Sequence, residues 1–410
     1  MKFTPESLTR CAARLGTLSG LERIPDVILE TPLLMLYTKR GSVPHVTKDV
    51  LEMITTERQI LTLSLPSTFT MADPVRQFKS IGDFIGLKEY PVFLTIQDPT
   101  EVTAPGYNEK DTVALWTRHG KRLINPDEYM DIVEAFRPDF YMPLCDGDTN
   151  SKSSSKRVQK SVDRSKKFME KCLARHNNSE VIRNKAIIAA VEGGYSTEAR
   201  KLYIENLEGK DFSGYVIDGL HSNGPDVESI NFEGVEEVVK YTINLLPEEK
   251  MRISMGSWNP ETMINLVELG VDLFDSTYPY FITERFCALT FLSQHSTGDE
   301  SPMISLGESR YADDFTPICK GCQCLTCQNH TRAYLNHLHH TKELLERVLL
   351  MIHNTHHYLE YFKEIRESLK NGTFQDLKSR IHKKFISFIL AIFTMPSCAL
   401  QRFFLAQCAL

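Results

Sequence analysis

Three cysteines fall within six residues of the chain, in a C-x-C-x-x-C run made of Cys322, Cys324 and Cys327, and His353 follows further along. Three thiolates and one imidazole are the complement of a closed, four-coordinate Zn²⁺ site, which holds structure rather than doing chemistry. Buried free thiols are the alternative, but a polar, turn-like segment is a poor place to bury three of them. The sequence therefore predicts one structural Zn²⁺ per chain, bound by these four residues, with Cys319 as a possible extra ligand.

A second set of chemically capable residues consists of carboxylates, each placed just after a short apolar run: Asp98, Asp146, Glu192, Asp218 and Asp275. A (β/α)₈ barrel builds its site from residues at the carboxyl ends of several successive strands. An open doubly wound sheet would instead gather them at one switch point beside a glycine-rich phosphate loop, and the sequence contains no such loop. Acidic residues also end strands because they favour turns. That explanation accounts for one or two of these positions more easily than for five.

The apolar runs alternate with helical patterns along the first three quarters of the chain. The expected strands are Ile60–Leu65, Val92–Ile96, Phe140–Leu144, Ala186–Val191, Gly214–Ile217, Ile253–Met255 and Val271–Phe274. The expected helices are Asp73–Ile85, Pro126–Phe136, Ser155–Leu173, Ser196–Leu207, Val235–Leu246 and Pro260–Leu269. Such alternation predicts a parallel sheet covered by helices. The expected fold is thus α/β, a (β/α)₈ barrel with a C-terminal zinc-binding subdomain.

Length and polarity divide the chain further. At 410 residues it is too long for one small domain, and we expect a barrel over 1–305, a zinc-binding subdomain with a closing helix over 306–370, and a tail over 371–410. The apolar segment Phe385–Leu410 is too short before Pro396 to span a bilayer. It can be a packed helix, an interfacial segment or an unrelated tail, and the sequence does not separate these.

Charge and cysteine usage limit the class of protein. The chain has ten cysteines, and the six outside the region Cys319–Cys327 are scattered singly, which is typical of a reducing compartment. No secretory signal opens the sequence. The net charge of −6 argues against wholesale nucleic-acid binding. The segment Lys152–Lys167 is nevertheless strongly basic, with one acid, Asp163. It is either a solvated helix face or a surface that contacts phosphates.

Several motifs of this chain together resemble those of the tRNA-guanine transglycosylases. The most specific are the cysteine run with His353 and the strand-end segment Gly270–Ser276, followed by Pro279. Further matching segments are Val191–Gly194 with Arg200, Gly214–Leu220, and Ser161–Ser165 with Arg157. The resemblance covers about Leu33 to Lys370. It implies the same barrel and the same zinc subdomain.

The enzymes of that family replace guanine by a deazaguanine base such as queuine at the wobble position of the tRNA anticodon. Double displacement at the ribose C1′ requires a carboxylate nucleophile and a second carboxylate that moves protons. By resemblance, Asp275 stands at the nucleophile position and Asp146 at the position that binds the edge of the base.

The rest of the pocket departs from the family pattern. Where the enzymes carry Asp-Ser-Gly-Gly-Phe-Gln, this chain has Asp98 followed by Pro99, which stiffens a loop that glycines would keep open. Glu192 stands where the enzymes use a glutamine, so an acceptor-only group replaces an amide. Asp218 replaces a glycine and brings another charge into a base-sized pocket. Asp275 can then be retained as a hydrogen-bonding strand end with no nucleophilic role.

This combination of a kept scaffold, a kept zinc signature and an altered pocket resembles the non-catalytic members of the family. The resemblance implies a heterodimer with a catalytic homologue, tRNA as the shared substrate, and residence in the cytoplasm and peripherally at the mitochondrial outer membrane. It implies no catalytic residue and no confident substrate-binding residue in this chain. The alternatives are a transglycosylase active alone, with Asp275 as nucleophile and Asp98 as acid/base, and a free-standing zinc protein that binds nucleic acid.

Overall fold

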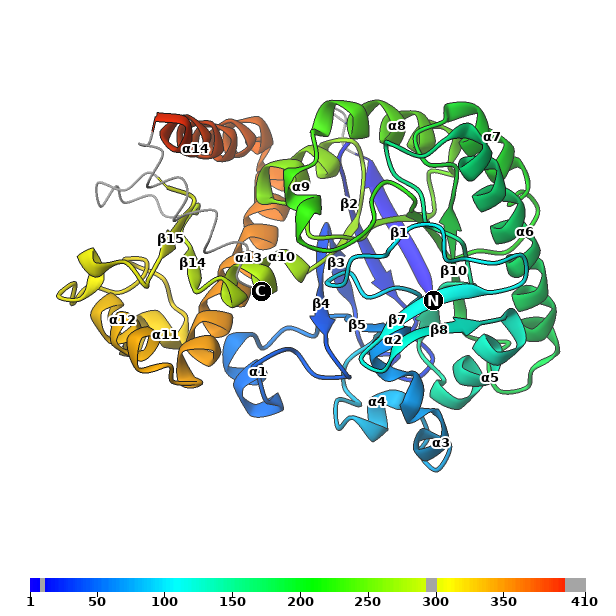
Figure 1. Ribbon diagram of the computed structural model, residues 1–410, viewed down its shortest axis with the longest axis horizontal. Coiled ribbons are helices and arrows are strands. Elements are labelled where there is room, and N and C mark those ends of the chain that lie inside the picture. The colour runs from blue at the N-terminus through cyan, green and yellow to red at the C-terminus, as the bar shows by residue number, and fades with distance from the viewer. Residues whose placement is uncertain (8–11, 293–300, 395–410) are drawn as a thin grey trace. The chain divides into compact units, whose positions relative to one another are not determined.

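The computed structural model describes residues 1–7, 12–292 and 301–394, without the side chains of 388–394. Within this range the chain forms two compact units (Figure 1). The first comprises Met1–Val43 and Glu57–Thr277, and the second comprises Pro44–Thr56 and the chain from Tyr278 onward. The compact division therefore falls after Thr277, and the segments 1–305, 306–370 and 371–410 stay a prediction of domain organisation.

Eight parallel strands close into a barrel in the first unit. Their order around the barrel is β10, β11, β12, β13, β4, β5, β6, β9. Their bounds are β4 Leu33–Thr38, β5 Leu61–Ser64, β6 Val92–Thr95, β9 Phe140–Tyr141, β10 Ala186–Val191, β11 Gly214–Ile217, β12 Met251–Ser254 and β13 Leu273–Asp275. Every residue of these strands is buried, as expected for parallel strands covered by helices. The closed barrel confirms the predicted fold class.

Helices and short helical turns surround the barrel. Their bounds are α2 Leu65–Thr68, η1 Phe69–Met71, α3 Ala72–Val75, α4 Ile81–Phe84, α5 Pro126–Phe136, α6 Ser155–Asn178, α7 Thr197–Glu205, η2 Pro225–Ser229, α8 Phe232–Leu245 and α9 Pro260–Glu268. The helices α4 to α9 each begin at a capping side chain. Asn125 forms a full capping box with Glu128, which fixes the start of α5 where the sequence predicts it. The single helix expected over Asp73–Ile85 is wrong, because the Ser80 side chain caps a new helix at α4.

Three features of the first unit lie outside the predicted alternation. The first barrel strand, β4, is not among the expected strands. An antiparallel sheet precedes it, made of β1 Lys2–Ser7, β2 Arg14–Ser19 and β3 Leu29–Thr31. An antiparallel hairpin, β7 Val113–Thr117 with β8 Gly120–Ile124, interrupts the alternation between β6 and α5.

The second unit is mainly helical. Its elements are α1 Lys48–Ile54, α10 Thr277–Glu284, β14 Cys287–Leu289, β15 Met303–Ser305, η3 Ser309–Tyr311, α11 Leu325–Asn329, α12 Arg332–Thr341, α13 Leu345–Asn371 and α14 Phe374–Thr394. The long helix α13 is its core, since it packs on α1, α11, α12 and α14. Of the expected tail, residues 395–410 lie outside the described range. In the part that is described, no helix combines the length and apolar character needed to cross a membrane.

Candidate metal centre and the mouth of the barrel

The four predicted zinc ligands converge on one point in the second unit. The Nδ1 atom of His353 lies 3.9 Å from Cys322 Sγ, 3.5 Å from Cys324 Sγ and 3.3 Å from Cys327 Sγ. Sulfur and nitrogen ligands at about 2.3 and 2.0–2.1 Å from a tetrahedral Zn²⁺ would lie about 3.6 Å apart. The donor set and its spacing therefore fit a metal ion of the zinc class.

Local structure brings these ligands together. Cys324 is the N-cap of α11, and its Sγ accepts the backbone N–H of Cys327 at 3.3 Å. His353 is fully buried on α13, where its Nε2 donates to the carbonyl of Leu289 at 2.8 Å. That hydrogen bond leaves Nδ1 free to bind a metal, which is the usual arrangement of a metal-bound histidine. Cys319 is not part of this group of four, but it lies close to His353 in a second group with His357, and its Sγ donates to the Leu289 carbonyl, 3.7 Å away.

Asp275, at the nucleophile-like position, is the last residue of β13 and is fully buried. Its Oδ2 accepts the backbone N–H of Gly256 at 2.5 Å, and its Oδ1 accepts that of Thr277 at 2.8 Å. Burial raises the pKa of Asp275 to about 6 although these hydrogen bonds oppose the shift. Both oxygens thus fasten the loops at the mouth of the barrel to one another.

Asp98, three residues past β6, is also buried, and both of its carboxylate oxygens accept hydrogen bonds. Its Oδ1 accepts the Tyr37 hydroxyl at 3.0 Å, the Thr100 hydroxyl at 2.7 Å and the Thr100 backbone N–H at 3.0 Å. Its Oδ2 accepts the Ser64 hydroxyl at 2.8 Å. Asp98 therefore organises the ends of β4, β5 and β6 through four hydrogen bonds.

Asp146, at the position that resembles a base-binding acid, is fully buried and paired with cations of this chain. Its Oδ1 accepts Arg157 and, at 2.6 Å, the Asn108 amide. Its Oδ2 accepts Arg164 at 3.0 Å. Both arginines come from α6, one and three turns from its start. Donors of the chain itself occupy the carboxylate edge that would otherwise be offered to a base.

Glu192 and Asp218 fill the adjoining part of the mouth. Glu192 is fully buried after β10, and burial, reinforced by Asp218 and Asp146, raises the pKa of its carboxyl well above the usual value. Asp218 follows β11 and reaches the backbone of Gly147, where an added Cβ would lie 2.5 Å from Asp218 Oδ2. A cavity of about 50 Å³ lies at this point, which is room for a few water molecules and not for a purine.

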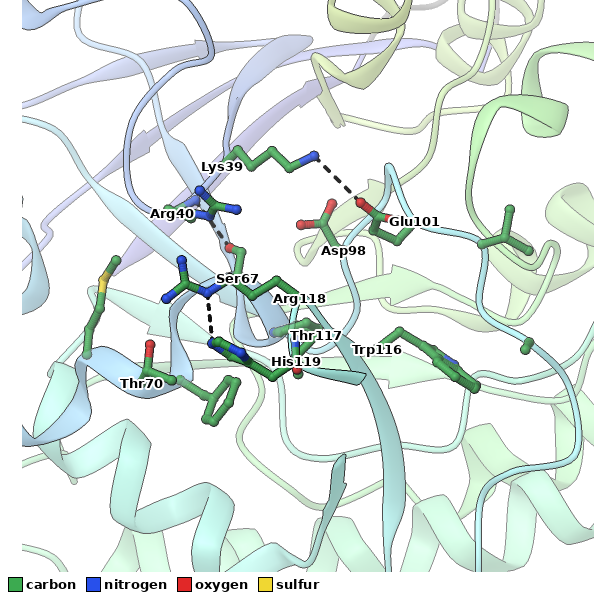
Figure 2. A pocket seen from close by; sticks show the side chains of 15 residues that line it. Lys39, Arg40, Ser67, Thr70, Asp98, Glu101, Trp116, Thr117, Arg118 and His119 are labelled. Atoms are coloured by element: carbon green, nitrogen blue, oxygen red, sulfur yellow. Dashed lines mark hydrogen bonds and ion pairs between the residues drawn. The ribbon is translucent and has the colours of Figure 1, made fainter. Parts of the chain in front are cut away.

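A larger polar pocket lies beside Asp98, with a volume of about 520 Å³ (Figure 2). Lys39 and Arg40 follow β4, and Arg118 and His119 form the turn of the β7–β8 hairpin. Arg118 Nε lies 2.9 Å from His119 Nε2, while Lys39 pairs loosely with Glu101 at 3.6 Å. The pocket thus carries more basic than acidic side chains. The sequence interpretation missed it because the hairpin was not predicted.

Comparison with known proteins assigns this architecture to a family. The family model described as queuine tRNA-ribosyltransferase matches residues 9–387. The chain belongs to this family. Curated relatives named queuine tRNA-ribosyltransferase accessory subunit 2 are 39% identical in Anopheles gambiae, over 93% of this chain and 90% of the relative, and 40% identical in Culex quinquefasciatus, over 93% and 91%. The relative of that name in Drosophila mojavensis is 39% identical over 90% and 89%.

The family barrel therefore brings together the five carboxylates expected at its mouth, and the zinc-ligand set falls in the other unit. Sequence reasoning missed the residues that occupy the mouth from within, Arg157 and Arg164, which it read as part of a basic surface. Their spacing of seven residues, two helical turns, places them on one face of α6 with the buried Ser161 and Ser165. This spacing is the sequence signal that could have placed both arginines on the inward face of α6.

Proposed function

We propose that this chain is a non-catalytic subunit of a queuine tRNA-ribosyltransferase. It pairs with a catalytic homologue and helps to hold the tRNA while that partner exchanges guanine for queuine at the wobble position of the anticodon. The names of the curated relatives support the subunit assignment. The single observation that carries the non-catalytic role is the pairing of Asp146 with Arg157 and Arg164.

The internal pairing of these carboxylates supports this role on chemical grounds. A base-exchange enzyme needs a free acceptor for the base and two carboxylates that reach the ribose C1′. In this chain Asp146 is neutralised by two guanidinium groups, Asp98 accepts four hydrogen bonds, and Asp275 accepts two backbone N–H groups. Opening such a site for a purine would leave buried charges without partners, which is costly.

The tRNA contact that we propose involves α6 and the pocket beside Asp98. Lys152, Lys156 and Lys160 are exposed at and near the start of α6, while the arginines of the same segment turn inward. Lysines on an exposed helix face neutralise phosphates without reading bases. Arg332 is not available for such contacts, because it is 9% exposed and pairs with Asp314 at 3.1 Å. Its role is therefore inside the second unit.

The partner contact that we propose lies at the start of α13. Leu344 is 79% exposed and Leu345 is 42% exposed, whereas Leu349 and Ile352 are buried in the core of the second unit. Two adjacent leucines left in solvent are typical of the edge of an association surface. The apolar residues in this part of the chain thus divide into a buried set, which packs α13 in the second unit, and an exposed pair, Leu344 and Leu345, which is available for an interface.

The metal and the location complete the proposal. The cluster of Cys322, Cys324, Cys327 and His353 would hold one structural Zn²⁺, whose bonds would clamp α11 to α13. We place the chain in the cytoplasm and, peripherally, at the mitochondrial outer membrane. This location rests on the resemblance alone.

A base-exchange assay tests the proposed function. Incorporation of labelled guanine into tRNA is measured for the purified chain, for a purified catalytic homologue and for their mixture. The expected result is background incorporation by this chain and a gain when the two are mixed. Turnover by the lone chain that disappears in Asp275→Ala would instead establish an enzyme that is active alone.

A further inference from the structure

Three potential metal ligands meet at the carboxyl ends of three adjacent barrel strands. Cys145 follows β9, Glu192 follows β10 and Asp218 follows β11, and their ligand atoms all lie within 4.8 Å of one another. The Sγ of Cys145 lies 3.8 Å from Asp218 Oδ2. Sulfur and oxygen ligands of one tetrahedral Zn²⁺ would be about 3.6 Å apart. The spacing therefore suits a shared ion with little adjustment.

The Glu192 carboxylate has no adequate protein partner. Beyond a side-chain contact with Cys145, its Oε1 lacks a hydrogen-bond partner although the residue is fully buried. Its Oε2 lies 3.5 Å from Ser161 Oγ, but that hydroxyl donates at 2.5 Å to the carbonyl of Asp146. A buried carboxylate oxygen without a hydrogen-bond partner lowers the stability of the fold unless a cation or a proton binds to it.

Two arginines lie near the cluster, but neither forms a salt bridge with it. Arg200 is fully buried and directs its three nitrogens at the carbonyls of Val191, Gly194 and Asp218. Arg157 forms ion pairs with Asp146 and Asp148. Among the described residues, neither Glu192 nor Asp218 takes part in a salt bridge, although Arg157 interacts electrostatically with Glu192. Arg200 thus stabilises the charged forms of Glu192 and Asp218 only through space, and within the described residues the two carboxylates and the thiol form no salt bridge with a cation.

The surroundings leave room for a further ligand. The cavity of about 50 Å³ at this point is lined by Cys145 and Asp218, together with polar groups such as Thr103 and Asn223. By the same measure of volume, a water molecule needs about 10–15 Å³, and it needs several polar partners. One thiolate, two carboxylates and one water make a complete four-coordinate set.

We propose that Cys145, Glu192 and Asp218 bind a second divalent metal ion of the zinc class, with a water from the adjoining cavity as the fourth ligand. The thiolate selects a borderline or soft ion, since Mg²⁺ and Ca²⁺ take oxygen ligands. Binding forms one metal–sulfur and two metal–oxygen bonds and releases the thiol proton of Cys145, with any proton on Glu192, to solvent. In the resemblance described above, Glu192 and Asp218 replace uncharged residues of the enzymes. The ion would therefore close the altered base pocket from within.

Metal stoichiometry of the full chain tests the site. The chain is dialysed against Zn²⁺, freed of loosely bound metal, and measured by elemental analysis. The expected result is two zinc ions in the unaltered chain, one in Glu192→Gln, one in Cys145→Ser and one in Cys324→Ser. The matched control is Asp148→Asn, which alters a buried neighbouring carboxylate outside the cluster and should keep two ions.

Thermal unfolding provides a second readout for variants that bind metal weakly. Added Zn²⁺ should raise the Tm of the unaltered chain and of Asp148→Asn, and should leave that of Glu192→Gln unchanged. Glu192→Gln is expected to fold, because it removes an uncompensated buried charge. One zinc ion in the unaltered chain after saturation, or two in Glu192→Gln, overturns the proposal. Neither result bears on whether the chain exchanges bases.

Discussion

A carboxylate at the end of a barrel strand can serve chemistry or structure, and its hydrogen-bond partners separate the two. Asp146 faces two guanidinium groups of its own chain, and Asp275 accepts two backbone N–H groups. Asp146 and Asp275 stand at positions that resemble functional ones of the enzymes, but their carboxylate oxygens accept hydrogen bonds from groups of this chain. Residue identity alone therefore does not establish a nucleophile.

We expect Asp275→Ala to destabilise the chain rather than to abolish a reaction. The substitution leaves the N–H groups of Gly256 and Thr277 buried without an acceptor, at a cost of about 2–4 kcal/mol in the free energy of unfolding. Urea denaturation measures this loss. At a temperature where Asp275→Ala is folded, base exchange by its complex with the catalytic subunit should change less than about twofold. The matching substitution in the catalytic subunit should abolish base exchange.

Glu346 predicts a pH dependence of stability in the second unit. It is 2% exposed, and burial raises its pKa from the ordinary value of 4.5 to about 7. Between these values the unfolded chain loses the proton while the folded chain keeps it. Stability contributed by the protonated carboxyl is thus complete below about pH 4.5 and is lost as the pH rises through 7.

Glu346→Gln removes this titration. Relative to the unaltered chain, the variant should gain about 1–3 kcal/mol between about pH 5.5 and pH 8, as measured by urea denaturation at both values. The matched control is Glu343→Gln, since Glu343 is exposed and should show no pH-dependent gain. Equal gains at both pH values in Glu346→Gln would show that burial does not shift this group.

At the scale of elements, local signals were predictable and long-range packing was not. The bounds of α5 agree with the sequence because Asn125 and Pro126 mark its start within the chain itself. The run of β4 is uniformly buried and apolar, so periodicity alone does not distinguish it from a helix. Which face of α6 turns inward depends on the barrel around Asp146, and this decided the roles of Arg157 and Arg164.

The exposed lysines of α6 should affect tRNA binding by the complex. Lys156→Glu with Lys160→Glu is expected to weaken binding at least tenfold at low salt, with a smaller difference at high salt, because phosphate contacts release counterions. Filter binding across a salt series measures this. Lys240→Glu on α8 is the matched control, exposed on a different helix. If the double variant binds like the control, α6 does not contact tRNA.

The exposed pair at the start of α13 should affect pairing with the catalytic homologue. Leu344→Asp with Leu345→Asp places charge in an apolar interface, and co-purification should be lost while zinc content and Tm stay unchanged. Leu349→Asp is unsuitable for this test, because Leu349 is 2% exposed and its replacement would unfold the second unit. Retained stoichiometric co-purification of the double variant would place the interface elsewhere.

At the scale of the whole molecule, the division into two units predicts that metal loss acts locally. Cys324→Ser removes one ligand and the sulfur cap of α11, so the clamp between α11 and α13 should open. Hydrogen exchange should accelerate over Cys322–His353 and stay slow in the barrel strands. Elemental analysis should show loss of this zinc ion, and full retention would contradict the ligand assignment.

The second unit is discontinuous in sequence, and this affects the order in which the protein can be built. Its helix α1 contacts α13, where His356 hydrogen-bonds the backbone of Ile54. The whole of Glu57–Thr277 separates α1 from the rest of its unit. During synthesis α1 is therefore made first, and it can pack on α13 only after the entire barrel sequence has been synthesised. A fragment that begins at Tyr278 would lack this helix, so neither translation from an internal start nor cleavage after the barrel would release a complete second unit.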